Sequence, residues 1–179
     1  MADIESMLSD IVAREGGFVD LGADRGGATK YGITERELGV WLGHPASVAD
    51  VQALDVDTAK AIYRKNYYLA PHIDQLPDLI QPVMLDAAVN SGPGQAVRWL
   101  QAVLNANNYG PLTEDGGIGA KTIAAASAAA SAMGAALNTA LIEARRAFLQ
   151  HLAMNDPSQQ EFEKGWMNRC DELQTQYCV

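Results

Sequence analysis

A glutamate followed by two glycines, Glu15-Gly16-Gly17, is the first place in the chain where acid–base chemistry could occur. Apolar residues repeat with helical spacing over residues 4–14, and glycine is common just past a helix end, so a helix should end at Glu15. A carboxylate there faces the negative end of the helix dipole, which disfavours its charged form. A carboxyl that keeps its proton is what a general acid requires. Many surface glutamates end helices without such a role, however.

A second carboxylate, Asp24, follows in a glycine-rich turn. A helix end and a turn that face each other could hold two carboxylates on opposite walls of a cleft. Glycosidic hydrolysis uses such a pair, an acid that protonates the leaving oxygen and a base that activates water. The hydroxyl of Thr29 could orient that water. Asp24 could equally hydrogen-bond its own turn, and Asp20 is a competing candidate for the base.

Five ordered blocks of sequence extend these motifs over nearly the whole chain. They are Glu15-Gly16-Gly17-Phe18 with residues 24–34, residues 63–68 with Leu76-Pro77, residues 86–96 with Leu100-Gln101, residues 115–122, and residues 165–169. Together they resemble glycoside hydrolase family 108, whose members are lysozyme-like N-acetylmuramidases found as phage endolysins and as bacterial enzymes tied to release or secretion.

The resemblance implies hydrolysis of the β-1,4 bond between N-acetylmuramic acid and N-acetylglucosamine in peptidoglycan, without a metal or another cofactor. The catalytic glutamate of the family lies in its Glu-Gly-Gly-Tyr/Phe element, which falls on Glu15 here. Similarity to the wider phage-type lysozyme arrangement gives the second and third catalytic roles to Asp24 and Thr29. A lytic transglycosylase, which needs the glutamate alone, and a non-catalytic peptidoglycan-binding module are the alternatives.

Tyr31, Tyr67 and Asn90 are candidates for contacts with the sugar chain. Packing of an aromatic cluster explains Tyr67 equally well. Asp86 and Asn90 lie one turn apart in an otherwise apolar helix, and buried polar groups need partners. Two interpretations remain open for this pair. The two side chains could face the cleft, or they could hydrogen-bond the backbone of the corner at residues 92–94 and so brace it; we favour the second interpretation.

The elements that must position these residues are mostly helical. Capping-box patterns at Thr34 with Glu37 and at Ser47 with Asp50 each predict a helix start. The remaining predictions are a loop and short β-hairpin over residues 18–33 and helices over residues 55–67 (opened by Asp55 or Asp57), 81–90, 95–105, from 120, 137–154 and from Asp156-Pro157. We therefore predict a mainly α, lysozyme-like α+β fold: a helical bundle with a small β-hairpin near the active site.

The charge of the chain excludes some function classes. The formal net charge is −9, mostly from the first half, and no basic run exists. A nucleic-acid-binding protein needs basic residues to neutralise phosphates, and an anionic membrane would repel this chain. No run of about 18 apolar residues is present, so no stable membrane insertion is predicted.

Two lobes packed on each other are predicted: a lysozyme-like catalytic lobe over residues 1–90 and a helical lobe over residues 91–179 that resembles a peptidoglycan-binding region. The N-terminus lacks the features of a signal peptide. We therefore expect a monomer that is made in the host cytoplasm and acts on peptidoglycan glycan strands in the periplasm after release through a holin-like pore. The two cysteines are expected to be thiols on a terminal helix.

Overall fold

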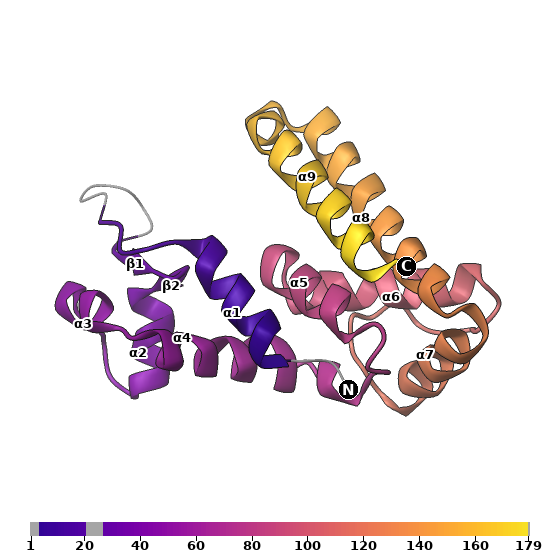
Figure 1. The fold of residues 1–179 in the computed structure, drawn as a ribbon, viewed down its shortest axis with the longest axis horizontal. Helices are drawn as coiled ribbons and strands as arrows, with labels where there is room; N and C mark the ends of the chain where they lie inside the picture. The colour runs from indigo at the N-terminus through magenta and orange to yellow at the C-terminus, as the bar shows by residue number, and fades with distance from the viewer. Residues whose placement is uncertain (1–3, 21–26, 179) are drawn as a thin grey trace. The chain divides into compact units, whose positions relative to one another are not determined.

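The computed structural model describes residues 4–20 and 27–178. The fold in Figure 1 is mainly α with one antiparallel hairpin, as the sequence predicted. The described residues fall into two compact units, residues 4–66 and residues 67–178. This division lies within the predicted 1–90 lobe, and the boundary at residue 90 stays a prediction.

The unit of residues 4–66 is built around the first helix and the hairpin. Leu8, Ile11 and Val12 form the buried face of α1, which packs against α4. In the same unit α2 packs against β2 and α3. The elements are α1 (Ile4–Glu15), β1 (Thr29–Lys30), β2 (Ile33–Thr34), α2 (Glu35–Leu42), α3 (Val48–Ala53) and α4 (Val56–Tyr63).

Local capping chemistry fixes the starts of three helices in this unit. The Thr34–Glu37 capping box opens α2 and the Ser47–Asp50 box opens α3, both as predicted. Asp55, rather than Asp57, caps α4 by accepting a hydrogen bond from the N–H of Thr58 at 2.7 Å. Each cap satisfies backbone N–H groups that the first helical turn leaves without partners.

The unit of residues 67–178 is a set of packed helices. Residues 81–88 of α5 are all buried, which confirms the predicted central helix. α8 and α9 lie side by side, and α6 packs against α5, α7 and α8 (Figure 1). The elements are η2 (Ile73–Gln75), α5 (Gln81–Ser91), α6 (Pro93–Ala106), α7 (Ala120–Met133), α8 (Ala135–Asn155), η3 (Pro157–Gln159) and α9 (Gln160–Tyr177).

Three predicted boundaries were wrong. The helix expected over residues 55–67 is α-helical only to Tyr63 and continues as a π-helix, η1 (Arg64–Leu69). α6 begins at Pro93 instead of residue 95, because proline suits the first turn of a helix, where its missing N–H costs nothing. Asp156 caps the short 3₁₀ helix η3, and α9 follows that turn.

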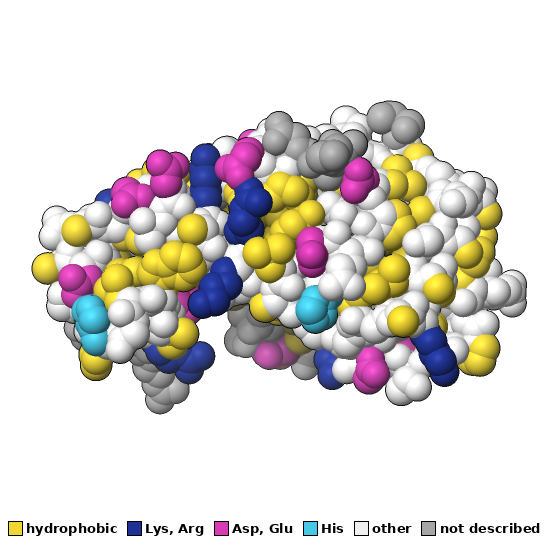
Figure 2. All heavy atoms as spheres, turned by 90° about the horizontal axis from the view of Figure 1, so that it is seen from below, with side chains coloured by type: hydrophobic (Ala, Val, Ile, Leu, Met, Phe, Trp, Pro, Cys, Tyr) yellow, Lys and Arg dark blue, Asp and Glu magenta, His cyan; other side chains and the backbone are white. Residues whose placement is uncertain are grey.

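Apolar side chains also reach the surface, as Figure 2 shows for one face. The most exposed large ones in the described residues are Val40 and Met154, each 77% exposed. No single helix of the described chain has the length and hydropathy to cross a membrane. The helices α7 and α8 meet those criteria only as a pair, and they are bent by 117° at the break between them.

Candidate active site

Glu15 is the last residue of α1 and is exposed. Gly16 follows with a φ of +82°, a left-handed conformation that suits glycine and ends the helix. The carbonyl of Gly16 accepts a hydrogen bond from the Tyr31 N–H at 3.1 Å. Val19 and Thr29 then exchange two backbone hydrogen bonds, each of 2.8 Å. The segment after Glu15 is therefore fastened along β1.

Tyr31 and Gly32 form the two-residue turn between β1 and β2. Their φ angles, +54° and +74°, are both positive, as in the type I′ turn that matches the twist of a hairpin. The carbonyl of Tyr31 accepts a hydrogen bond from the buried Tyr63 hydroxyl at 2.9 Å. Since Tyr63 is the last residue of α4, this bond holds the turn to that helix.

The turn lies directly against the carboxylate of Glu15. A Cβ atom placed on Gly32 would be 2.8 Å from Glu15 Oε2 and 2.5 Å from the Tyr63 hydroxyl oxygen. A side chain at this position would force the Glu15 carboxylate and the Tyr63 hydroxyl to shift. The Glu15 carboxylate and the Tyr63 hydroxyl thus meet at the backbone of one glycine.

The sequence predicted Glu15 as a site residue but did not indicate that Tyr63 and Gly32 lie against it. Both residues lie in the blocks that carried the family resemblance, which is the one signal that pointed to them. The contact itself joins three separate segments of the chain, so no local pattern could reveal it.

Asp24 lies outside the described residues, and its role stays a prediction. The described residues after it are fastened by Glu35 at the start of α2, whose carboxylate accepts a hydrogen bond from the Ala28 N–H at 3.0 Å. Gly27 has a φ of +65°, and a Cβ there would be 2.9 Å from the same carboxylate oxygen. Asp20, the competing candidate, is exposed and follows Val19, which pairs with Thr29.

The structure brings three of the predicted site residues into one unit. Glu15, Thr29 and Tyr31 are linked through the backbone hydrogen bonds of the Gly16 segment, β1 and the turn. Thr29 and Tyr31 are half-buried, and Lys30 Nζ lies 5.3 Å from the centroid of the Tyr31 ring. The other two described candidates, Tyr67 and Asn90, belong to the unit of residues 67–178.

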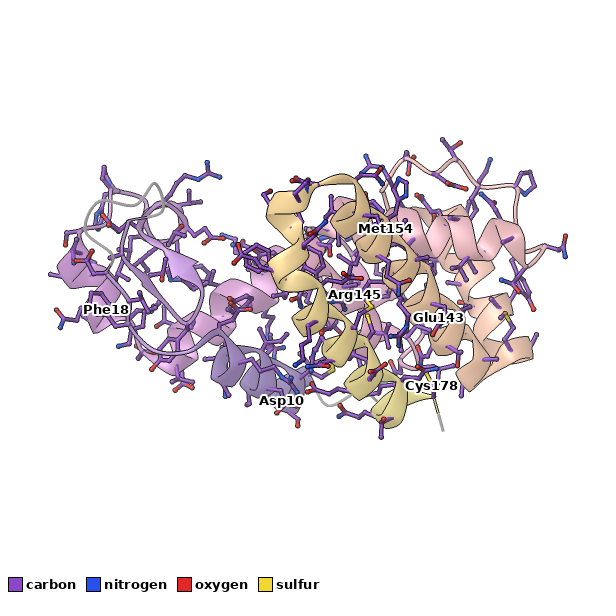
Figure 3. All side chains as sticks on the ribbon, turned by 90° about the horizontal axis from the view of Figure 1, so that it is seen from above. Asp10, Phe18, Glu143, Arg145, Met154 and Cys178 are labelled. Atoms are coloured by element: carbon purple, nitrogen blue, oxygen red, sulfur yellow. The ribbon has the colours of Figure 1, made fainter. Side chains whose placement is uncertain are left out.

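Asp86 does not brace the corner at residues 92–94 as we favoured from the sequence. Its buried carboxylate accepts hydrogen bonds from Arg169 Nε at 2.7 Å, from the Asn90 amide at 3.1 Å and from Arg145 Nη1 at 3.3 Å. Figure 3 labels Arg145 on α8, the helix that packs on α9. A buried carboxylate is stabilised best by charged donors, which the corner backbone cannot supply.

The electrostatics of Arg169 agree with this pairing. Desolvation by itself lowers the pKa of the Arg169 guanidinium, but the charge of Asp86 and its hydrogen bond outweigh that effect, so the pKa is raised. Arg169 therefore stays charged when it is partly buried.

The mainly α fold, with a small hairpin whose turn packs against an exposed glutamate at a helix end, has the architecture of a lysozyme-like protein. Residues 8–92 match the family model described as Glycosyl hydrolase 108, and residues 95–171 match the one described as Predicted Peptidoglycan domain. The chain belongs to glycosyl hydrolase family 108, which confirms the resemblance found in the sequence. It is a peptidoglycan-degrading enzyme of the muramidase type.

A solved structure of a relative covers almost the same length. It is described as the structure of Brucella abortus SagA, and the two chains are 34% identical. The match covers 98% of this chain and 95% of that one, with a TM-score of 0.77. No curated protein matches the chain.

Proposed function

We propose that the enzyme hydrolyses the β-1,4 bond between N-acetylmuramic acid and N-acetylglucosamine and that Glu15 is its proton donor. The observation that carries this proposal is the position of Glu15, an exposed carboxylate at the end of α1 that the Gly32 turn closely approaches. Exposure allows the carboxyl to reach a glycosidic oxygen, and the turn limits its movement. Both properties are needed by a general acid, which must lie within hydrogen-bonding reach of the oxygen that it protonates.

In the proposed reaction, the Glu15 proton passes to the leaving glycosidic oxygen as the bond from that oxygen to the anomeric carbon breaks. A water oxygen attacks the same carbon, and Asp24 accepts a proton from this water, which Thr29 helps to orient. This inverting path needs carboxyl groups about 6.5–9.5 Å apart, whereas a separation of about 5–5.5 Å would favour a retaining path. We propose that Tyr31, Tyr67 and Asn90 contact the sugars.

The proposed setting is lysis of a host cell by a phage or prophage. The enzyme is made in the host cytoplasm, passes a holin-like pore and cleaves glycan strands in the periplasm as a monomer. The alternative setting is a bacterial enzyme that remodels the wall to aid protein secretion. The likeness to a protein of the bacterium Brucella abortus over 98% of the chain supports the bacterial origin that this alternative requires.

Digestion of purified peptidoglycan tests the chemistry. We expect Glu15→Gln to reduce the rate at least about a hundredfold, since removing a general acid typically costs a factor of about 10² to 10⁴. Glu161→Gln is the matched control, because Glu161 is also an exposed helical glutamate but lies in the first turn of α9. Asp24→Asn, measured in parallel, tests the second carboxylate separately.

The products identify the bond. Reduction of the digest with borohydride followed by mass spectrometry should give muramitol at the new ends. Glucosaminitol would identify the opposite linkage as the one cleaved, and anhydro-muramic ends would identify a lytic transglycosylase. Unchanged activity of Glu15→Gln would exclude Glu15 as the acid.

A further inference from the structure

The unit of residues 67–178 contains a pocket in which Asn90 alone among the lining residues has a role in the proposed hydrolysis. Its volume is about 320 Å³, within the range of small-molecule sites. Leu149, Leu152 and the two aromatic rings of Phe148 and Trp166 supply apolar walls. The polar lining residues are Asn90, Ser91, Gln95, Arg145 and Gln159.

Arg145 is the feature of this pocket that points to a ligand. Its side chain is only 2% exposed, although it lines the pocket. Its Nε–H has no hydrogen-bond partner among the described residues. A buried donor without a partner is rare in native proteins, because losing water without gaining another acceptor is costly. An acceptor brought by a ligand would remove that cost.

The charges around Arg145 indicate that this acceptor is anionic. Arg145 shares the buried carboxylate of Asp86 with Arg169, and Arg169 has the shorter contact, 2.7 Å against 3.3 Å. Glu172 pairs with the far side of Arg169 but is itself half exposed. Two guanidinium groups therefore compete for one buried carboxylate, and a second carboxylate at Arg145 would complete the pairing.

The apolar walls limit what the carboxylate can be attached to. The Phe148 ring packs edge-on against Trp99, with centroids 5.3 Å apart, yet remains 40% exposed. Trp166 contacts Phe162 at a centroid distance of 6.0 Å. Two aromatic rings that each contact a neighbouring ring form a surface for a small apolar group, and the side-chain amides among the lining residues suit a peptide bond.

We propose that this pocket binds a peptide end, a carboxylate attached to a small apolar residue such as alanine. In an enzyme that acts on peptidoglycan the natural source is the stem peptide, and this source rests on the proposed function. The lactyl carboxylate of muramic acid has related chemistry and is the competing source. The pocket then holds the substrate by its peptide while a separate site cleaves its glycan.

Titration of the ¹⁵N-labelled full-length chain tests the proposal, with N-acetyl-D-alanyl-D-alanine as the probe. This probe has no glycosidic bond, so its binding is independent of the digestion result. We expect saturable shifts of the Trp166 indole N–H and the Arg145 Nε–H. The C-terminal amide of the same dipeptide should bind at least about tenfold more weakly, since it lacks the charge. Equal binding of acid and amide, no binding, or a preference for N-acetylmuramic acid would each overturn the proposal.

Two variants locate the binding. Arg145→Lys keeps the charge but removes the Nε–H, and Phe148→Ala removes one apolar wall; each should weaken binding at least about tenfold. Met154→Ala, on the same helix but outside the pocket, should leave it unchanged. Thermal unfolding verifies that each variant folds, and Phe148→Ala decides the outcome where Arg145→Lys does not fold. Wild-type affinity in Phe148→Ala would assign the probe to another site.

Discussion

Gly32 occupies the point where the hairpin turn meets the carboxylate of Glu15. Its φ of +74° is a conformation that side chains rarely adopt, and the space where a Cβ would stand is taken by oxygen atoms of Glu15 and Tyr63. Tyr63 in turn holds the preceding carbonyl of Tyr31. At the scale of single residues, the position of the Glu15 carboxylate therefore depends on Gly32 and on the buried hydroxyl of Tyr63 as much as on α1.

Gly32→Ala should lower both stability and activity. The substitution combines a strained backbone with displacement of the Glu15 carboxylate, and we expect a loss of about 1–3 kcal/mol in the free energy of unfolding. Urea unfolding and peptidoglycan digestion measure the two effects. Gly17→Ala is the matched control for stability, because an added Cβ at Gly17 meets nothing within 4 Å. A Gly32→Ala enzyme with wild-type stability and activity would show that the turn does not constrain Glu15.

At the scale of elements, two of the sequence blocks, residues 86–101 and residues 115–122, contact each other in one structural cluster. The side-chain amide of buried Gln101 on α6 donates to Asp115 Oδ1 at 2.8 Å and to the Gly117 carbonyl at 2.9 Å. Its oxygen, Oε1, accepts from the Gly116 N–H at 2.9 Å. A Cβ on Gly116 would lie 2.7 Å from the Gly94 carbonyl oxygen. The long loop between α6 and α7 is thus tied to the start of α6.

Removing this clamp should destabilise the loop. Gln101→Ala removes three hydrogen bonds to the loop, and we expect a loss of about 1–3 kcal/mol in the free energy of unfolding. Amide hydrogen exchange at Gly116 should accelerate, whereas the exposed Gln150→Ala on α8 should change neither quantity. Unaltered exchange at Gly116 in Gln101→Ala would contradict a clamping role.

Whether a contact could be predicted from the sequence depends on how far apart its two residues lie along the chain. The capping boxes of α2 and α3 join residues three apart, so spacing alone predicted them. Asp86 meets Arg145 and Arg169 across 59 and 83 residues, and helical periodicity carries no information on such partners. The same reason explains why Glu15 could be proposed as a site residue from its motif, whereas its approach to the turn could not be predicted.

At the scale of the whole molecule, each of the two units contains aspartates whose hydrogen bonds make its stability depend on acidic pH. The pKa values of Asp50 and Asp55 are lowered by hydrogen bonds from Ser47 and Thr58, and that of Asp115 is lowered first by Gln101. Asp50 and Asp55 lie in the unit of residues 4–66 and Asp115 in the other. A carboxyl whose pKa is lower in the folded state than in the unfolded state stabilises the fold at pH values above its unfolded-state pKa. This stabilisation is lost as the pH falls through its folded-state pKa.

Acid should therefore destabilise both units over the range below the ordinary aspartate value of 3.8. Melting temperatures measured between pH 6 and pH 2 are expected to decline over that range. Asp55→Asn should weaken the decline for the unit of residues 4–66, because its amide cannot lose a charge. An identical pH profile for Asp55→Asn and wild type would exclude the α4 cap as a contributor.

Alkaline pH should destabilise the unit of residues 67–178 through Cys170, because both cysteines of the chain lie in that unit. Both cysteines are free thiols. Cys170 lies on the buried side of α9, and this burial raises the pKa of its thiol above the ordinary value of 9.0. A thiol whose pKa is higher in the folded state than in the unfolded state stabilises the fold at pH values below its unfolded-state pKa. This stabilisation is lost as the pH rises from the unfolded-state pKa through the folded-state pKa. Melting temperatures should thus fall more steeply above about pH 9 in wild type than in Cys170→Ala.

The reactivity of the two thiols checks the same physics independently. Half-buried Cys178 should react with iodoacetamide in the folded protein at pH 8, whereas Cys170 should react only after unfolding, because the thiolate is the reactive form and burial both disfavours and shields it. Peptide mass spectrometry after labelling with and without urea separates the two sites. Equal labelling of Cys170 and Cys178 without urea would show that α9 does not stay packed on α8, and the buried Asp86–Arg169 pair would then have to open as well.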